Sequence, residues 1–126
     1  MRGLSIITAV IVAATLAACG QEGIDLNDDA DQQVQDGAVL FSERCAGCHT
    51  LDAAGTQGTA NRSERAQGPN LNQRVESYDD AIYAIRNGGF SGAIMPQNIV
   101  VGEDAEAVAR FVEEYAGSDA DDPSGG

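Results

Sequence analysis

Apolar residues recur at helical spacing in three parts of the chain, and capping residues mark where the helices begin and end. In residues 102–116 the apolar positions repeat every three or four residues, as on one face of an α-helix: Ala105, Val108, Phe111, Val112 and Tyr115. Residues 77–87 show the same spacing, with Ser77 placed to cap the start and Gly88 to end the helix. A shorter helix is predicted to open at Asp36. No segment alternates apolar and polar residues as a strand does, so the pattern predicts an all-α fold.

The two ends of the chain differ from this helical middle. Residues 1–18 hold one Arg followed by an apolar run that is short and rich in Ala for a membrane span, and they are typical of an export signal. Residues 19–35 are polar and acidic with scattered apolar residues, and we expect a flexible tether. Residues 118–126 are predicted to be a disordered acidic tail. The helical domain is therefore expected to span residues 36–117.

The export signal ends in Leu16-Ala17-Ala18-Cys19-Gly20, which is similar to the cleavage site of bacterial lipoproteins. In such sites a branched apolar residue and two small residues precede a Cys that is acylated and becomes the mature N-terminus. Several acyl chains on Cys19 would hold the protein stably at a membrane, since a single chain gives only marginal binding. The same pattern also fits an ordinary signal peptide cleaved after Ala, or an uncleaved anchor.

Two cysteines three positions apart, followed at once by a histidine, form the most specific motif of the chain: Cys45-Ala46-Gly47-Cys48-His49. This spacing is the attachment signature of c-type haem. Positions i and i+3 of a helical turn lie on one face, so both sulfurs can form thioether bonds to the two vinyl groups on one porphyrin edge. His49 is then carried under the iron, where a neutral imidazole nitrogen can bind it. One covalently attached haem c is thus the expected cofactor.

A Cys-x-x-Cys pair alone would also fit a thiol redox pair or half of a zinc site. A zinc site needs two further ligands, and the chain has only one His and one other Cys. A thioredoxin-like dithiol needs a βαβ context, which the pattern does not show. With Cys19 assigned to lipid and the pair to haem, no thiol is left free.

Two proline-containing segments supply candidates for the remaining contacts of the iron. Gly68-Pro69-Asn70-Leu71 holds a Pro whose backbone carbonyl can be fixed in direction, and a ligating His usually donates its second ring N–H to such an acceptor; the alternative is an ordinary turn. Further on, Pro96 favours an extended Met95, whose thioether can then point at a metal. A lone Met is more commonly a core filler. Met95 is, however, the only Met beyond the initiator, and no Lys or spare Cys competes with it.

The charge of the chain is strongly negative and limits its partners. Its 7 basic residues, all Arg, face 20 acidic ones, and the formal net charge is −13. Binding to nucleic acid or to an anionic lipid surface through charge is therefore disfavoured. A redox partner with a basic or neutral docking patch would be tolerated, and an acidic one would be repelled.

Over residues 36–117 the order of these motifs resembles the class I monohaem cytochromes c of bacteria. The resemblance rests on Cys45–His49, Gly68–Leu71, Met95–Pro96 and a final amphipathic helix. It implies a small fold of three to four helices around one covalently bound haem, with the first and last helices crossing near Gly37. It also implies that the Pro69 carbonyl accepts from His49 and that Met95 is the second axial ligand of the iron.

The chain departs from this family in having no Trp and no Lys. Family members often use such residues near a haem propionate or in a docking ring. The groups that neutralise the propionates here therefore remain open, with Arg65, Arg74 and Asn70 as candidates.

The implied protein is an electron-transfer protein and not an enzyme. It would cycle Fe(III)/Fe(II) of a His/Met-ligated haem c between extracytoplasmic or membrane redox partners, with no open iron site for oxygen or peroxide. Two alternatives stay open: an open-site haem sensor or peroxidase-like enzyme, and a dedicated haem subunit of an oxidase or dehydrogenase complex. The expected location is the outer face of the cytoplasmic membrane, or a membrane facing the periplasm, through the lipid on Cys19.

Overall fold

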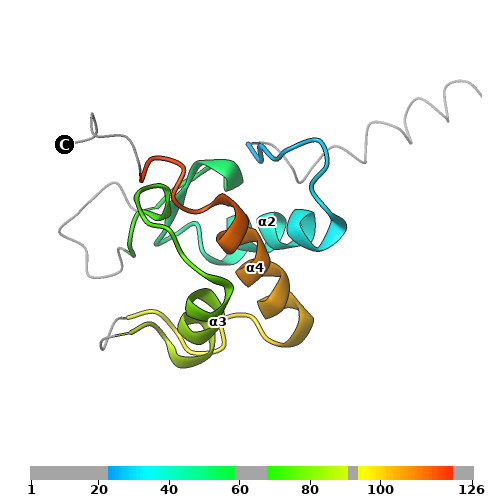
Figure 1. The fold of residues 1–126 in the computed structure, drawn as a ribbon. Helices are drawn as coiled ribbons and strands as arrows, with labels where there is room; N and C mark the ends of the chain where they lie inside the picture. Colours follow the sequence, from blue (N-terminus) through cyan, green and yellow to red (C-terminus); the bar gives the residue numbers. More distant parts are fainter. Residues whose placement is uncertain (1–22, 59–67, 91–93, 121–126) are drawn as a thin grey trace, which may run out of the picture.

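The computed structural model describes residues 23–58, 68–90 and 94–120, and three α-helices form the body of the fold there (Figure 1). They are α2 (Gln32–Arg44), α3 (Tyr78–Asn87) and α4 (Gly102–Tyr115). The connections hold two short 3-10 helices and two short strands: β1 (Thr50–Leu51), η2 (Asp52–Ala54), β2 (Thr56–Gln57) and η3 (Leu71–Gln73). The predicted helical fold is confirmed, while the predicted export signal and Cys19 lie outside the described residues. None of the described helices is both long and apolar enough to cross a membrane.

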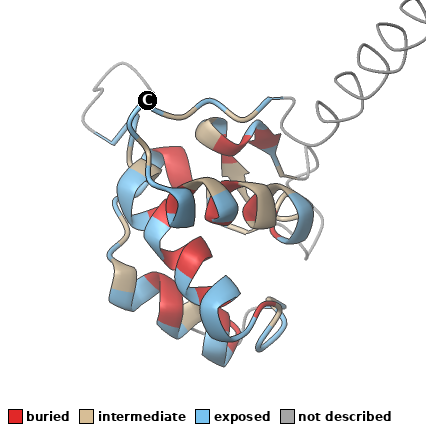
Figure 2. Ribbon diagram, turned by 90° about the vertical axis from the view of Figure 1, so that its right-hand side faces the viewer, coloured by how far each residue is buried: buried red, intermediate tan, exposed pale blue. Residues whose placement is uncertain are grey.

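Helices α2 and α4 pack across each other, and they come closest at a glycine. A Cβ built on Gly37 of α2 would collide with the backbone carbonyl of Ala107 and would lie 2.9 Å from the Cβ of Phe111. Phe41, one turn further along α2, meets the Phe111 ring edge-on at a centroid distance of 5.6 Å. Buried residues line the inner faces of these helices (Figure 2). The predicted crossing of the first and last helices near Gly37 is thereby confirmed.

Helix α2 begins earlier than the sequence predicts. Asp31 is its N-cap, and the Asp31 carboxylate accepts a hydrogen bond from the Val34 amide at 2.9 Å. Asp36 lies inside the helix, where its carboxylate accepts from the Gln32 side-chain amide at 2.8 Å. The predicted start at Asp36 is therefore wrong. Both Asp31 and Asp36 are residues that can cap a helix. Val34 is already buried on the apolar face of α2, so the helix must begin before it, at Asp31.

The described part of the predicted tether is folded against the domain. Ile24 and Leu26 pack against the hydrophobic core. The Asn27 amide donates to the Tyr115 hydroxyl at 3.0 Å, a contact between opposite ends of the domain. We call residues 23–31 the strap. The prediction of a flexible tether is wrong for this segment, because two scattered apolar residues suffice when they meet a core built by the rest of the chain.

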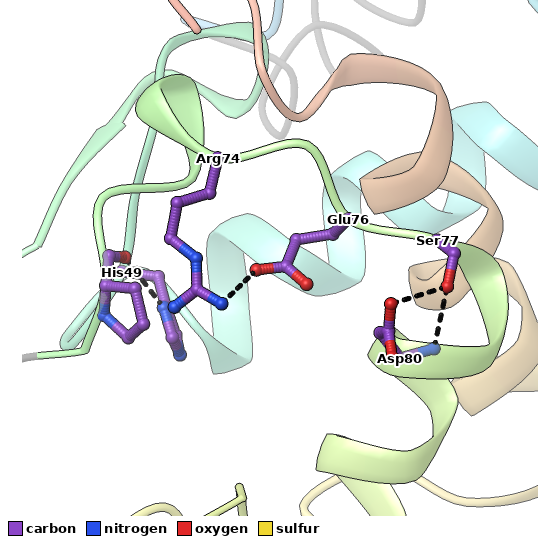
Figure 3. A network of polar contacts seen from close by, with 6 residues as sticks. His49, Arg74, Glu76, Ser77 and Asp80 are labelled. Atoms are coloured by element: carbon purple, nitrogen blue, oxygen red, sulfur yellow. Dashed lines mark hydrogen bonds and ion pairs between the residues drawn. The ribbon is translucent and has the colours of Figure 1, made fainter.

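Helix α3 begins and ends as predicted. The Ser77 hydroxyl accepts from the Asp80 amide at 3.1 Å and donates to the Asp80 carboxylate at 2.7 Å (Figure 3). Gly88 ends the helix with a left-handed φ of 79°. The buried face of α3 consists of Ala81, Ile82 and Ile85, which are three of the residues in the predicted apolar stripe.

The segment that follows the haem motif contains a small sheet that the sequence does not predict. Strands β1 and β2 pair antiparallel on either side of η2. The Thr56 hydroxyl accepts from the Leu51 amide and donates to the His49 carbonyl oxygen, both at 3.1 Å. Two-residue strands are too short to show alternation in the sequence, so no pattern marks them, and the fold class remains helical.

The start of the predicted acidic tail lies against η3. The amides of Gly117 and Asp119 donate to the carbonyl oxygens of Leu71 and Asn72, both at 2.8 Å. The prediction of a disordered tail from residue 118 is therefore wrong for its first residues, whereas residues 121–126 lie outside the described part of the chain.

Candidate haem site

The Cys-x-x-Cys-His segment forms one turn directly after α2. The Cys45 amide donates to the Phe41 carbonyl oxygen at 2.8 Å, and the His49 amide donates to the Cys45 carbonyl oxygen at 2.9 Å. These bonds follow the spacing of a helix, so Cys45 and His49 lie four residues apart on one face. Cys45 is buried and Cys48 is partly buried, and no disulfide joins the two.

Cys45 and His49 line an apolar cavity between the three helices and the connection from α3 to α4. Its volume is about 930 Å³ when the space open to solvent is included. Pro69 and Met95 line the same cavity. Six further apolar residues are part of the lining: Phe41, Leu71, Ala81, Ala84, Ile85 and Val112. The structure thus brings together four of the residues singled out in the sequence, whereas Cys48 is not among the lining residues.

The imidazole of His49 is held from two sides by the segment around Pro69. Its Nδ1 lies 3.1 Å from the Pro69 carbonyl oxygen (Figure 3). A carbonyl oxygen can only accept, so this bond requires the proton on Nδ1 and leaves the lone pair on Nε2. A Cβ built on Gly68 would come within 2.5–2.8 Å of three ring atoms. Gly68 therefore leaves the space that the ring occupies, and Nε2 is the nitrogen available to a metal ion.

Burial controls the ionisation of both His49 and Cys45. It lowers the pKa of His49, against an opposing effect of the hydrogen bond to Pro69, and so favours the neutral imidazole that a metal ion needs. Burial, together with the neighbouring Cys48 thiol, raises the pKa of Cys45 to about 12. Thiol exchange needs the opposite shift, because the thiolate is the nucleophile. Cys45 is therefore poorly suited to act as the nucleophile of a dithiol, the alternative that the motif alone leaves open.

An ion pair stands at the wall of the cavity. Arg74 Nη2 lies 3.0 Å from Glu76 Oε1, and both side chains line the cavity (Figure 3). The Arg74 side chain is half exposed, whereas that of Glu76 is only 12% exposed. Of the other candidates for the propionates, Arg65 lies outside the described residues, and the Asn70 side chain accepts from the Asn72 amide at 3.0 Å. Glu76 belongs to no motif, and only the folded connection from η3 to α3 places it here.

Met95 reaches the cavity from the connection between α3 and α4, which is tied back to α3. The Asn98 amide donates to the Ile85 carbonyl oxygen at 2.8 Å, and the Gln97 side-chain amide donates to the Asn87 carbonyl oxygen at 3.2 Å. Met95 itself is partly buried and packs against the core. These contacts hold it at the cavity wall.

Three apolar side chains are exposed next to the cavity. Phe90 lines the cavity, and its ring stacks on that of Tyr83 of α3 at a centroid distance of 5.1 Å. Both are exposed, as is Ile94, which directly precedes Met95. We call Tyr83, Phe90 and Ile94 the mouth patch. No pattern in the sequence marks these three residues, because exposed aromatic residues follow no periodicity.

A helical fold with a Cys-x-x-Cys-His turn at an apolar cavity defines a class of small proteins that carry covalently attached haem. Comparison with known proteins agrees. The family model for cytochrome c matches residues 34–116. Cytochrome c-551 of Bacillus subtilis (strain 168) is 28% identical over 109 residues, which are 82% of this chain and 87% of that protein. The crystal structure of the c-type cytochrome SorU from Sinorhizobium meliloti is similar with a TM-score of 0.56 and 33% identity, and the match covers 70% of this chain and 95% of that chain.

The chain belongs to the cytochrome c family. The resemblance inferred from the motifs is confirmed, and so is the cofactor, because Cys45 and Cys48 have the spacing that attaches one haem c within a cytochrome c domain. The cavity fits this group: its lining is apolar, one cysteine of the motif stands in its wall, and His49 presents a neutral nitrogen. Proteins of this family carry electrons, so redox proteins are the partners that membership implies.

Proposed function

We propose that the protein is a membrane-tethered one-electron carrier whose haem c iron is bound by His49 and Met95. The observation that carries this proposal is the cavity, whose wall combines a cysteine of the haem motif, the His49 imidazole and the Met95 side chain. When bound there, haem c supplies a one-electron Fe(III)/Fe(II) couple.

The chain's own residues orient and insulate this couple. The Pro69 carbonyl fixes the direction of the His49 ring and increases its basicity as a ligand. Apolar lining residues disfavour the charged, oxidised form, and a soft Met95 thioether acts in the same direction. Both effects raise the reduction potential.

Met95 decides between this carrier and an open-site haem protein. His49 is the only His, Lys is absent, and the Cys pair is committed to haem. The sequence therefore offers the iron almost no other second ligand, and Met95 is the candidate that lines the cavity. If His49 and Met95 together held the iron, oxygen and peroxide would have no place to bind, which favours electron transfer without substrate chemistry.

Ferric absorption spectra test this ligation. We expect the wild-type holoprotein to show the methionine–iron band at neutral pH, and Met95→Leu, which removes the sulfur at similar volume, to lose it. Ile94→Ala, at the exposed neighbouring position, is the control and should keep the band. Absence of the band from the wild-type protein would favour the open-site sensor or peroxidase-like enzyme.

The lipid anchor is the part of the proposal that rests on sequence, namely the residues that lead to Cys19. Cell fractionation of wild type and Cys19→Ala tests it: we expect the wild-type protein in the membrane fraction and the variant in the soluble one. A soluble wild-type protein would contradict the lipid anchor, while the proposal that His49 and Met95 bind the iron would be unaffected. Co-purification at fixed stoichiometry in mild detergent would instead indicate a subunit of one redox complex.

A further inference from the structure

The strap is held to the domain along its length. The Asp25 amide donates to the Ala53 carbonyl oxygen of η2 at 2.9 Å, and the Asn27 amide donates to the Tyr115 hydroxyl of α4 at 3.0 Å. Its two apolar side chains pack against the core. These contacts join the strap to η2 and to the end of α4.

The first residue of the strap is in close contact as well. A Cβ built on Gly55, which has a φ of 66°, would collide with the backbone of Gly23. Only four chain steps separate Gly23 from Cys19, the proposed lipid site. Four residues span at most about 14 Å, whereas a domain of this size is roughly 30 Å across. The chain between lipid and domain is therefore shorter than the domain.

The strap lies against the domain away from the lining of the haem cavity. The strap contacts Ala53, Gly55 and Tyr115, none of which is among the described residues that line the cavity. The Tyr115 ring stacks on Phe111 at 5.4 Å, and Phe111 packs on Phe41, which does line the cavity. In Figure 1 the blue strap lies above α4, and α3 lies below α4. Residues of α3 form part of the cavity wall.

We infer that the strap holds the mouth of the haem cavity away from the membrane, so that the redox partner is a water-exposed protein domain and not a quinone within the bilayer. The inference rests on the lipid anchor of the proposed function. The chain that leads to the anchor would leave the domain at Gly23, away from the cavity lining. Because the connecting chain is shorter than the domain, the cavity cannot turn toward the bilayer unless the strap lifts.

The mouth patch is the surface that such a partner would meet. Its stacked Tyr83 and Phe90 rings provide exposed apolar area at the edge of the cavity, as the centre of a protein interface does. On exposed positions of α3, Asp79 and Asp80 lie one turn before Tyr83 and Arg86 lies one turn after it, so the acidic residues outnumber the basic one there, as they do in the whole chain. A partner with an apolar contact area edged by Arg or Lys would match this surface, whereas an anionic lipid surface would be repelled.

Fluorescence quenching in vesicles tests the orientation. Lipidated holoprotein is bound to phosphatidylcholine vesicles that carry a small fraction of headgroup-labelled lipid whose emission overlaps the haem absorption. Wild type is compared with Ile24→Ser/Leu26→Ser, which weakens the strap. The matched control is Val75→Ser/Val101→Ser, which changes two exposed apolar residues outside the strap. A freed chain from Cys19 to Gln32 spans roughly 20 Å, so we expect quenching per bound protein to increase about twofold or more in the strap variant only.

A second variant covers the case in which the strap substitutions unfold the domain. Twelve Gly and Ser residues inserted before Gly23 would leave the strap contacts intact and lengthen the chain to the lipid. We again expect more quenching than in wild type. Equal quenching by wild type and the insertion variant would overturn the inference while the anchor stands. A wild-type protein that does not bind the vesicles would instead contradict the anchor, and the inference with it.

Discussion

At the scale of single residues, backbone groups determine how His49 is presented. Pro69 supplies the carbonyl that accepts from Nδ1, and Gly68 supplies the space beside the ring. The sequence indicates this acceptor, because Pro fixes a carbonyl's direction. The contact of Gly68 with the ring could not be predicted from the sequence. Almost twenty residues separate His49 from Gly68, and the contact depends on where the chain returns after them. The same holds for Glu76, which no motif marks.

Gly68→Ala tests the presentation of the ring. The added methyl would come within 2.5–2.8 Å of the imidazole atoms, so the ring must shift and the bond to Pro69 must weaken. We expect covalent haem attachment to persist, because the cysteines are unchanged, with a loss of about 1–3 kcal/mol in the free energy of unfolding. Gly47→Ala is the control, because no atom lies within 4 Å of its Cβ position. Equal unfolding curves for the two variants would contradict the contact.

Glu76→Gln tests the influence of this partly buried carboxylate on the haem. Glu76 lines the cavity and forms an ion pair with Arg74. Removing a negative charge there disfavours the ferric, positively charged core, so we expect the reduction potential to rise by something on the order of tens of millivolts. Spectroelectrochemical titration measures this, with exposed Glu103→Gln at the start of α4 as the control. A potential that falls, or that rises equally in the control, would be inconsistent with this placement.

At the scale of elements, the sequence predicts those helix ends that are set by local capping residues. Helix α3 is predicted from end to end because Ser77 caps it and Gly88 ends it. The start of α2 is missed, because Asp31 and Asp36 are equal as caps until the burial of Val34 is known. The short strands are missed for a different reason, since their pairing arises from tertiary contacts.

Gly37→Ala tests the crossing of α2 and α4. In an isolated helix this change would stabilise by about 1 kcal/mol. Here the new methyl meets the Ala107 carbonyl, and the two helices must move apart. We therefore expect a net destabilisation of about 1–3 kcal/mol, measured by chemical denaturation of the holoprotein. Gln33→Ala, on the exposed side of α2, is the matched control and should change stability little. A more stable Gly37→Ala would show that the crossing is looser than described.

At the scale of the whole molecule, charge and the strap control how partners meet the haem. The formal net charge is −13, and two of the described arginines already pair with glutamates, Arg74 with Glu76 and Arg110 with Glu113. The sequence establishes the sign of this charge. It does not establish which side of the molecule faces a membrane, because the strap contacts join residues far apart in the chain.

Ionic strength tests the electrostatic part. We expect electron transfer to a small redox protein of high isoelectric point to be fast at low salt and to slow as salt is added, since attraction between opposite charges is screened. An acidic redox protein should show the reverse trend. Stopped-flow rates measure both, and a basic partner whose rate is independent of salt would contradict charge-assisted docking.

The most direct test of a closed, His49/Met95-ligated electron carrier is carbon monoxide binding to the reduced holoprotein. We expect the ferrous absorption spectrum of the wild-type protein to stay unchanged under carbon monoxide at neutral pH, because Met95 would hold the iron together with His49 and leave the gas no place to bind. Met95→Leu should bind the gas stoichiometrically, which shows that it can reach the cavity. Stoichiometric binding by the wild-type protein would contradict the closed site.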